Sequence, residues 1–211
     1  MKFCICFFGV ISRSLTKTIK SIETNIFDVL KENNIEYDVY IHNNIINKIY
    51  NIRNGANEKN IEINNDDYKL LNPTKYNEHQ QSLFDISYDW NIDQNTSVNI
   101  SENTYKNAIR QLYSVKCVTQ MWENDEEYDL YLYIRPDLLY TTKLDISIIL
   151  KNIDKNNILF TPDWGQNPIG YGLNDRIYFG KKDVMLKIAN RIDLIPKLYG
   201  SKMYHAERFM K

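Results

Sequence analysis

The sequence predicts an α/β fold with a mixed, mostly parallel central sheet flanked by helices, in one domain spanning residues 1–211. Continuous apolar runs, typical of strands buried on both faces, occur at 2–10, 130–134 and 158–161. Between them, apolar residues recur at steps of three and four, as they do on amphipathic helices. This alternation favours parallel strands joined by right-handed crossovers.

Composition limits the class of protein. Hydrophobic residues make up 43% and charged residues 25%, which is ordinary globular usage. The formal net charge of -1 argues against a nucleic-acid or membrane-surface partner. No apolar run is long enough to span a bilayer, and the N-terminus lacks the pattern of a secretory signal. Cys4, Cys6 and Cys117 have no metal-ligand spacing, so we expect a reducing, cytoplasmic location, with Cys4 and Cys6 buried and free.

The first half of the chain predicts a β-loop-α-β unit and then an excursion. The run 2–10 is the first strand, the helical periodicity of 15–29 follows it, and 37–42 alternates as a second strand. Residues 43–100 are rich in Asn and Asp, and we expect them to be irregular, with one short helix and one short strand. An excursion of this length is a lid, a binding element or lineage-specific padding.

A long helix is expected after Ser101, which is a plausible N-cap. Its core-facing stripe consists of Ala108, Ile109, Leu112, Val115, Val118 and Trp122. Asn107, Gln111 and Ser114 recur on another face, where a solvated surface is the alternative to a functional role.

The strand at 130–134 stops at Arg135-Pro136-Asp137, because proline cannot donate to a sheet ladder. In extended backbone Arg135 and Asp137 point to the same side. A charged pair at the carboxyl end of a buried strand lies where open α/β sheets bind ligands. The alternative is an exposed ion pair without function.

The last third continues the alternation. Asp145 caps a helix over 146–153, a buried strand follows at 158–161, another strand at 177–179, and a helix surrounds 184–189. The tail over 203–211 has a helical pattern without a stop signal. This leaves open that the chain is the N-terminal part of a longer protein with a further domain.

The sequence lacks a phosphate-binding glycine loop, a nucleophile elbow, HExxH and CxxC, which weakens hydrolase, acyl-transfer and zinc readings. Polar residues at strand ends remain as the candidates. Parallel strands bring their carboxyl ends to one edge, so we expect a single crevice there. The candidates are Arg13, Arg135, Asp137, Asp163, Trp164, Asn174 and Asp175.

Five segments resemble nucleotide-sugar-dependent glycosyltransferases of the GT-A type, especially those of large DNA viruses and of bacterial surface-polysaccharide loci. The resemblance covers most of the chain except about 43–100. Its segments are Gly9-x-x-x-Arg13, Asp38-Val-Tyr-Ile-His42, Gln111-x-Tyr113-Ser-x-Lys116, Arg135-Pro-Asp137 and Asn174-Asp-Arg-x-x-x-Gly180.

The resemblance implies a GT-A-like, Rossmann-like fold and transfer of a sugar from a nucleotide-sugar donor, most often UDP- or GDP-linked, to a glycan acceptor. In such enzymes the second Asp of an Asp-x-Asp motif binds a divalent metal. Here Asp137 takes that position and Arg135 replaces the first Asp. The implied cofactor is Mn²⁺ or Mg²⁺, with His205 as second ligand or as an exposed histidine. The replacement implies a metal held by fewer groups, or an arginine that supplies positive charge itself.

The resemblance also implies roles for the other candidates. Asp175 is the first choice for the base that takes the acceptor proton, followed by Asp163 and Glu207. Asn174 binds substrate, and Trp164 stacks on a sugar ring or lies in the core. Tyr40 or Tyr113 holds the donor base. The residues expected to bind the donor are Gly9, Arg13, Gln111, Tyr113, Lys116, Arg135 and Asp137.

Two other functions remain open on sequence grounds. A sugar nucleotidyltransferase shares this type of sheet, but carries a glycine-rich loop with Arg and Lys after the first strand, where this chain has only Gly9. A non-catalytic nucleotide- or carbohydrate-binding module would explain the missing first Asp of the metal motif.

Overall fold

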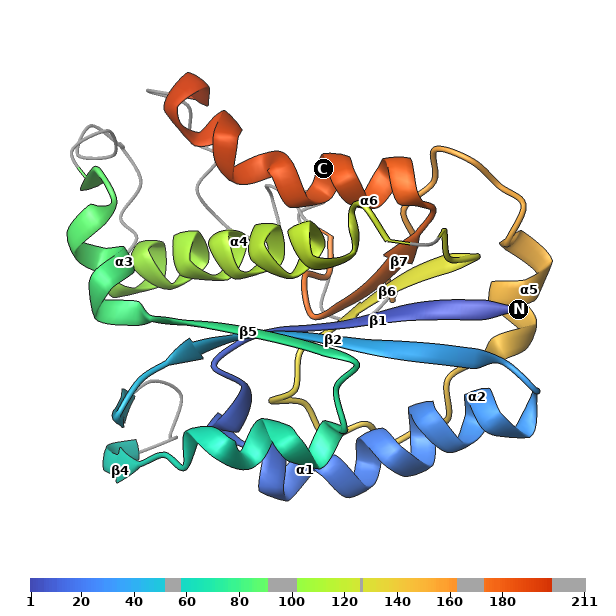
Figure 1. Ribbon diagram of the computed structural model, residues 1–211, viewed down its shortest axis with the longest axis horizontal. Coiled ribbons are helices and arrows are strands. Elements are labelled where there is room, and N and C mark those ends of the chain that lie inside the picture. Colours follow the sequence, from blue (N-terminus) through green and yellow to red (C-terminus); the bar gives the residue numbers. More distant parts are fainter. Residues whose placement is uncertain (52–57, 91–101, 126, 163–172, 199–211) are drawn as a thin grey trace.

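The computed structural model describes residues 1–51, 58–90, 102–125, 127–162 and 173–198, and contains a five-stranded sheet in the order β5-β2-β1-β6-β7 (Figure 1). β1 is parallel to β2 and β6, β2 is parallel to β5, and β7 is antiparallel to β6. The predicted mixed, mostly parallel sheet is therefore confirmed. Its strands are β1 (Lys2–Gly9), β2 (Glu36–Ile45), β5 (Lys75–Gln80), β6 (Leu130–Ile134) and β7 (Ile177–Gly180).

Helices cover both faces of this sheet (Figure 1). After the short 3-10 turn η1 (Ile11–Arg13), one face is covered by α1, a π-helical turn η2 and α2, which run on without a break, and by α5. On the other face lie α4, α6 and the 3-10 helix η6. The bounds are α1 (Leu15–Ile22), η2 (Glu23–Phe27), α2 (Asp28–Glu32), α4 (Glu102–Trp122), α5 (Ile146–Asn152), α6 (Lys182–Ala189) and η6 (Asn190–Leu198).

The expected irregular excursion over 43–100 is wrong for much of its described part. A hairpin of β3 (Lys48–Asn51) and β4 (Glu58–Glu62) is followed by η4 (Asn65–Leu71), β5 and α3 (Gln81–Ser87). β5 pairs with β2 and so belongs to the central sheet. Its sequence, KYNEHQ, gave no strand signal because it is an edge strand whose side chains are mostly exposed.

The buried strand expected at 158–161 is also wrong. Phe160 forms only an isolated antiparallel bridge with Phe179, and Ile158 is 39% exposed. The two phenylalanine rings stack with centroids 4.8 Å apart. The apolar run therefore meets β7 through this one bridge, with two backbone hydrogen bonds between Phe160 and Phe179, and does not continue the sheet.

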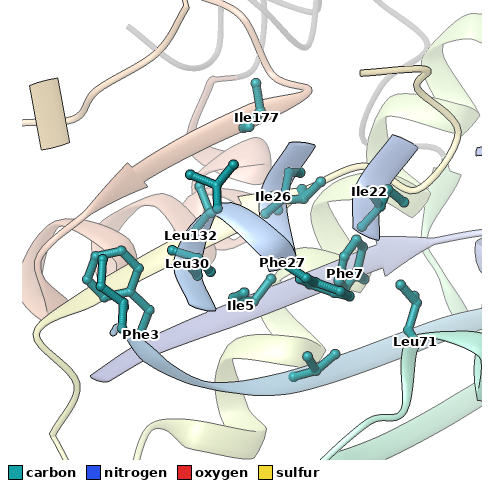
Figure 2. Close-up of a cluster of buried hydrophobic side chains, with 14 of the residues drawn as sticks. Phe3, Ile5, Phe7, Ile22, Ile26, Phe27, Leu30, Leu71, Leu132 and Ile177 are labelled. Carbon is teal, nitrogen blue, oxygen red and sulfur yellow. The ribbon is translucent and has the colours of Figure 1, made fainter. Parts of the chain in front are cut away.

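Side chains of β1 and β6 alternate between two separate cores. Phe3, Ile5 and Phe7 of β1 and Leu132 of β6 pack with α1, η2, α2 and α5, as Figure 2 shows for part of this cluster. Cys4 and Cys6 face α4 and α6, and both are buried and free, as predicted. Among the helices that the structure describes, none is long and apolar enough to cross a membrane.

Candidate functional site at the carboxyl edge of the sheet

The order of the strands reverses at β1. The chain places β2 and β5 on one side of β1 and then returns to add β6 on the other side. Open α/β sheets bind ligands outside the carboxyl ends of the strands at such a switch point. Here these ends are Gly9 of β1 and Ile134 of β6.

The antiparallel direction of β7 brings a further segment to this edge. Ile134 pairs with Ile177, the first residue of β7, and the Arg135 N–H donates to the Arg176 carbonyl at 2.8 Å. Residues 174–176, which precede β7, therefore lie beside the residues that follow β6. Asn174 and Asp175 therefore lie close to Arg135, as expected. They do so because β7 is antiparallel to β6, and not because parallel strands end at the same edge.

Arg135 and Asp137 form a bidentate ion pair. Arg135 Nε donates to Asp137 Oδ1 at 2.9 Å and Nη2 donates to Oδ2 at 2.6 Å. The ion pair considered as the alternative therefore forms, but its side chains are 28% and 18% exposed, so it is not fully exposed. Burial alone would raise the pKa of Asp137, but the Arg135 guanidinium, and more weakly Arg13, hold that pKa below its usual value.

The backbone around this pair is held against α1. The Thr18 hydroxyl donates to the Pro136 carbonyl at 2.6 Å, and the Tyr140 N–H donates to Ser21 Oγ at 3.1 Å. The Tyr140 hydroxyl donates to the Arg135 carbonyl at 3.1 Å. Because these bonds come from two sides, the backbone positions of Arg135 and Asp137 are fixed by tertiary structure.

Asp175 is buried at 5% exposure and contacts α4. Gln111 Nε2 donates to Asp175 Oδ2 at 2.9 Å, so two of the predicted site residues touch. The other oxygen, Oδ1, lies 3.8 Å from an Arg176 nitrogen, which is an ion pair but too long for a hydrogen bond. The fully buried Asn174 accepts from the Arg176 N–H at 2.9 Å and shapes the turn that presents Asp175.

Gly9 ends β1 with φ of 98°, a left-handed backbone that other residues avoid. A Cβ added there would meet no atom of the described residues within 4 Å, so the described structure leaves space for a ligand beside Gly9. Its N–H donates to Ser114 Oγ at 2.8 Å. Ser114 is fully buried, so the interpretation of its helix face as solvated is wrong at this position.

A histidine pair, of which His42 is buried and His79 half-buried, continues from Ser114. His42 Nδ1 lies 2.8 Å from Ser114 Oγ, and His42 Nε2 lies 3.1 Å from Nδ1 of His79. Burial, with a smaller contribution from His79, lowers the pKa of His42 to about 3. The Tyr113 ring packs edge-on against both imidazoles. Sequence reasoning quoted His42 within a motif without giving it a role, and missed His79 because β5 was not recognised.

Two predicted donor-binding residues have other partners. Lys116 pairs with Asp193 of η6 at 2.6 Å rather than with a group of the edge. Tyr40 is buried, and its hydroxyl bonds Asp125 at 2.6 Å and Tyr128 at 2.8 Å, so it is a core residue and not a platform for the donor base. The remaining predicted residues, Asp163, Trp164, His205 and Glu207, lie outside the described residues.

Three of the buried polar atoms that lack a hydrogen-bond partner in the described structure belong to residues at or next to strand ends. Ser12 follows β1, Asn44 lies near the end of β2, and Asp175 precedes β7. Their unpartnered atoms are Ser12 Oγ, Asn44 Oδ1 and Asp175 Oδ1. Such atoms are costly to bury, so each calls for a partner that the described residues do not supply.

The described residues do not fit a divalent metal at Asp137. No cluster of three or more histidine, cysteine or carboxylate side chains that could hold a metal occurs within the described ranges. Both oxygens of Asp137 already accept hydrogen bonds from Arg135. A metal would have to displace the Arg135 guanidinium, whose side chain is 28% exposed, from the carboxylate that accepts its two hydrogen bonds.

A surface hollow lies apart from this edge, between η2, α2 and η4. Lys20 and Lys31 line it, but each is paired with a carboxylate of its own helical turn, Glu23 or Asp28, at 3.7 Å. Its charges are balanced, so it does not compete with the carboxyl edge as the candidate site.

No protein-family model matches this chain, and neither does any curated protein. Among solved structures, the apo form of mouse xyloside xylosyltransferase 1 is similar, with a TM-score of 0.45 and 11% sequence identity over 100% of this chain and 80% of that one. A similarity this distant says nothing about function. The functional argument therefore depends on the contacts at the carboxyl edge.

Proposed function

We propose that the protein is a glycosyltransferase that moves a sugar from a nucleotide-sugar donor, UDP- or GDP-linked, to a glycan acceptor. The observation that supports this best is the meeting of Gly9, Arg135, Asp137 and Asp175 at the switch point of the sheet, next to open space and unpartnered polar atoms. The likeness to enzymes of viruses and polysaccharide loci, the cytoplasmic location and a further domain remain predictions.

The proposed chemistry divides between two groups. The leaving nucleoside diphosphate gains negative charge as the glycosidic bond breaks, and Arg13 and Arg135 would stabilise that charge electrostatically. The attacking acceptor hydroxyl must lose a proton, and Asp175 Oδ1, which has no hydrogen-bond partner among the described residues, would accept it. Gln111 would orient Asp175 through its bond to Oδ2.

The first experiment is thermal stability in the presence of UDP-, GDP-, CMP- and dTDP-sugars. A donor at one hundred times its dissociation constant stabilises the folded state by about 2.7 kcal/mol. Stabilisation by one nucleotide class would identify the donor base. The absence of any response would contradict the proposal.

The second experiment tests Asp175. Asp175→Asn should abolish sugar transfer while leaving donor stabilisation in place, because the amide cannot accept the proton but fills the same space. Asp154→Asn is the matched control, since Asp154 is exposed and lies outside the site. Transfer by Asp175→Asn at the wild-type rate would remove Asp175 from the mechanism.

A non-catalytic nucleotide- or carbohydrate-binding module is the second candidate. The observation that favours it is that Asp137 and one oxygen of Asp175 already have partners within the protein. A module would bind a nucleotide or glycan and release neither nucleotide nor sugar from any donor. Release of pyrophosphate from a nucleoside triphosphate and a sugar phosphate would instead identify a nucleotidyltransferase.

A further inference from the structure

We propose that Arg135 takes the place of a divalent metal at this site, so that the donor's diphosphate binds without one, and that Asp137 is a positioning residue for Arg135 rather than a metal ligand. This inference rests on the proposed function, because it concerns how the same site holds its nucleotide. It reverses the expectation that Asp137 binds Mn²⁺ or Mg²⁺.

The charges at the edge favour an anion over a dication. Asp137 interacts with Arg135 and Arg13, and Asp175 interacts with Arg135 and lies 3.8 Å from Arg176. These three arginines outnumber the two carboxylates, and a fourth, Arg191, is buried near Asp175. Among these described groups the arginines outnumber the carboxylates, which favours a diphosphate over a divalent cation.

The pairing geometry points the same way. Asp137 engages Nε and Nη2 of Arg135 and thereby fixes the plane of the guanidinium. Within the described residues, the hydrogen bonds of this guanidinium go only to Asp137, which uses two of its five N–H donors. The remaining donors, in a planar fork, match phosphate oxygens.

Moving Asp137 onto a metal would be unfavourable. Arg135 is largely buried, which lowers its pKa, but Asp137, and more weakly Asp175, outweigh that cost and raise the pKa above the usual value. A carboxylate that turned to a metal would leave a largely buried guanidinium facing that metal without its bidentate partner. The hydroxyls of Thr18 and Tyr140 donate to the carbonyls of Pro136 and Arg135, and these hydrogen bonds hold the backbone next to Asp137 in place.

The test is the dissociation constant of UDP and GDP, measured by calorimetry with excess EDTA and again with Mn²⁺. We expect the same affinity in both conditions for the wild-type chain. Arg135→Lys keeps the charge but loses the fork, and should weaken binding by about tenfold to a hundredfold in both. Asp137→Asn should weaken it too, with no rescue by Mn²⁺.

Arg110→Lys is the matched control. Arg110 forms the same kind of bidentate pair with Asp85, at 2.8 and 2.6 Å, on α4 and α3. This variant should leave the nucleotide affinity unchanged, which separates loss of an ion pair from loss of the phosphate contact.

Each result has a definite meaning. Binding that needs Mn²⁺, or Arg135→Lys with wild-type affinity, overturns this inference and leaves the glycosyltransferase proposal standing. Binding of neither nucleotide in either condition overturns the proposed function and this inference with it. If the wild-type chain binds equally well with EDTA and with Mn²⁺, and Arg135→Lys loses that binding, the result supports both the proposed function and this inference.

Discussion

One face of the central sheet is packed with aliphatic and phenylalanine side chains, whereas the other is packed with tyrosines, cysteines and a histidine. Leu132 and Ile134 face α5 and the α1–α2 segment, and their neighbours in β6, Tyr131 and Tyr133, face α4 and α6. All four are fully buried. The two cores therefore differ in chemistry and not in burial.

The buried hydroxyls of the tyrosine-rich face need hydrogen-bond partners, whereas the side chains of the aliphatic face do not. The Tyr133 hydroxyl lies 2.5 Å from the Thr119 hydroxyl and accepts from Trp122 Nε1 at 3.1 Å. Buried polar groups are tolerated only when they are hydrogen-bonded, so this face fixes the position of α4 with directional bonds. α4 in turn supplies Gln111 and Ser114 to the carboxyl edge. The polar face is thus the one that positions the candidate site.

The largest effect is expected on the aliphatic face. Leu132→Ala leaves a cavity under α1 and α2 and should lower the free energy of unfolding by about 2–5 kcal/mol. Chemical denaturation measures this directly. Ile148→Ala on α5, where the side chain is 53% exposed, is the control and should change stability by less than about 0.5 kcal/mol. Equal effects of the two variants would mean that Leu132 is not in the core.

A smaller effect is expected from the histidine pair as pH falls. The pKa of His42 is about 3 in the folded chain and about 6.5 when unfolded, so the unfolded chain binds more protons between these values. Stability should therefore be full above pH 6.5 and decrease below it, by about 2 kcal/mol at pH 5 from His42 alone. The pKa of His79 is also lowered by burial and adds to the same trend.

Thermal unfolding between pH 7 and pH 5 checks this prediction, because most carboxylates do not titrate in that range. His42→Gln should flatten the dependence, whatever its effect on stability at pH 7. An unchanged slope in this variant would show that His42 is not held neutral by burial.

The smallest expected change in the free energy of unfolding distinguishes two tyrosines of the polar face, Tyr133 and Tyr178. Tyr133→Phe leaves the Trp122 indole N–H without its partner and should cost about 1 to 2 kcal/mol. Tyr178 stacks on Tyr133 with ring centroids 5.3 Å apart, but its buried hydroxyl has no hydrogen-bond partner in the described parts of the chain. Tyr178→Phe should therefore be neutral or stabilising. A larger loss for Tyr178→Phe than for Tyr133→Phe would reverse the assignment of the network.

Sequence patterns identified the helices and strands whose burial shows in their own residue order. The apolar runs of β1 and β6 and the periodicity of α1 and α4 predict these elements, because a buried strand or an amphipathic helix must show its burial in the order of its residues. β5 was missed because its pairing with β2, and not its own polar sequence, makes it a strand. The run at 158–161 failed for the opposite reason, since its apolar residues form one bridge with Phe179 and no continuous ladder.

The sequence by itself determined the composition of the two cores, because alternate residues of a strand point to opposite faces whatever lies beyond them. It also determined that the sheet would be mostly parallel and that polar residues would follow its strands. Only the tertiary structure decided that β7 runs antiparallel to β6, which brings Asp175 beside Arg135, and how far the Arg135–Asp137 pair is buried. Strand direction and burial depend on which segments meet in space, and no local pattern encodes that.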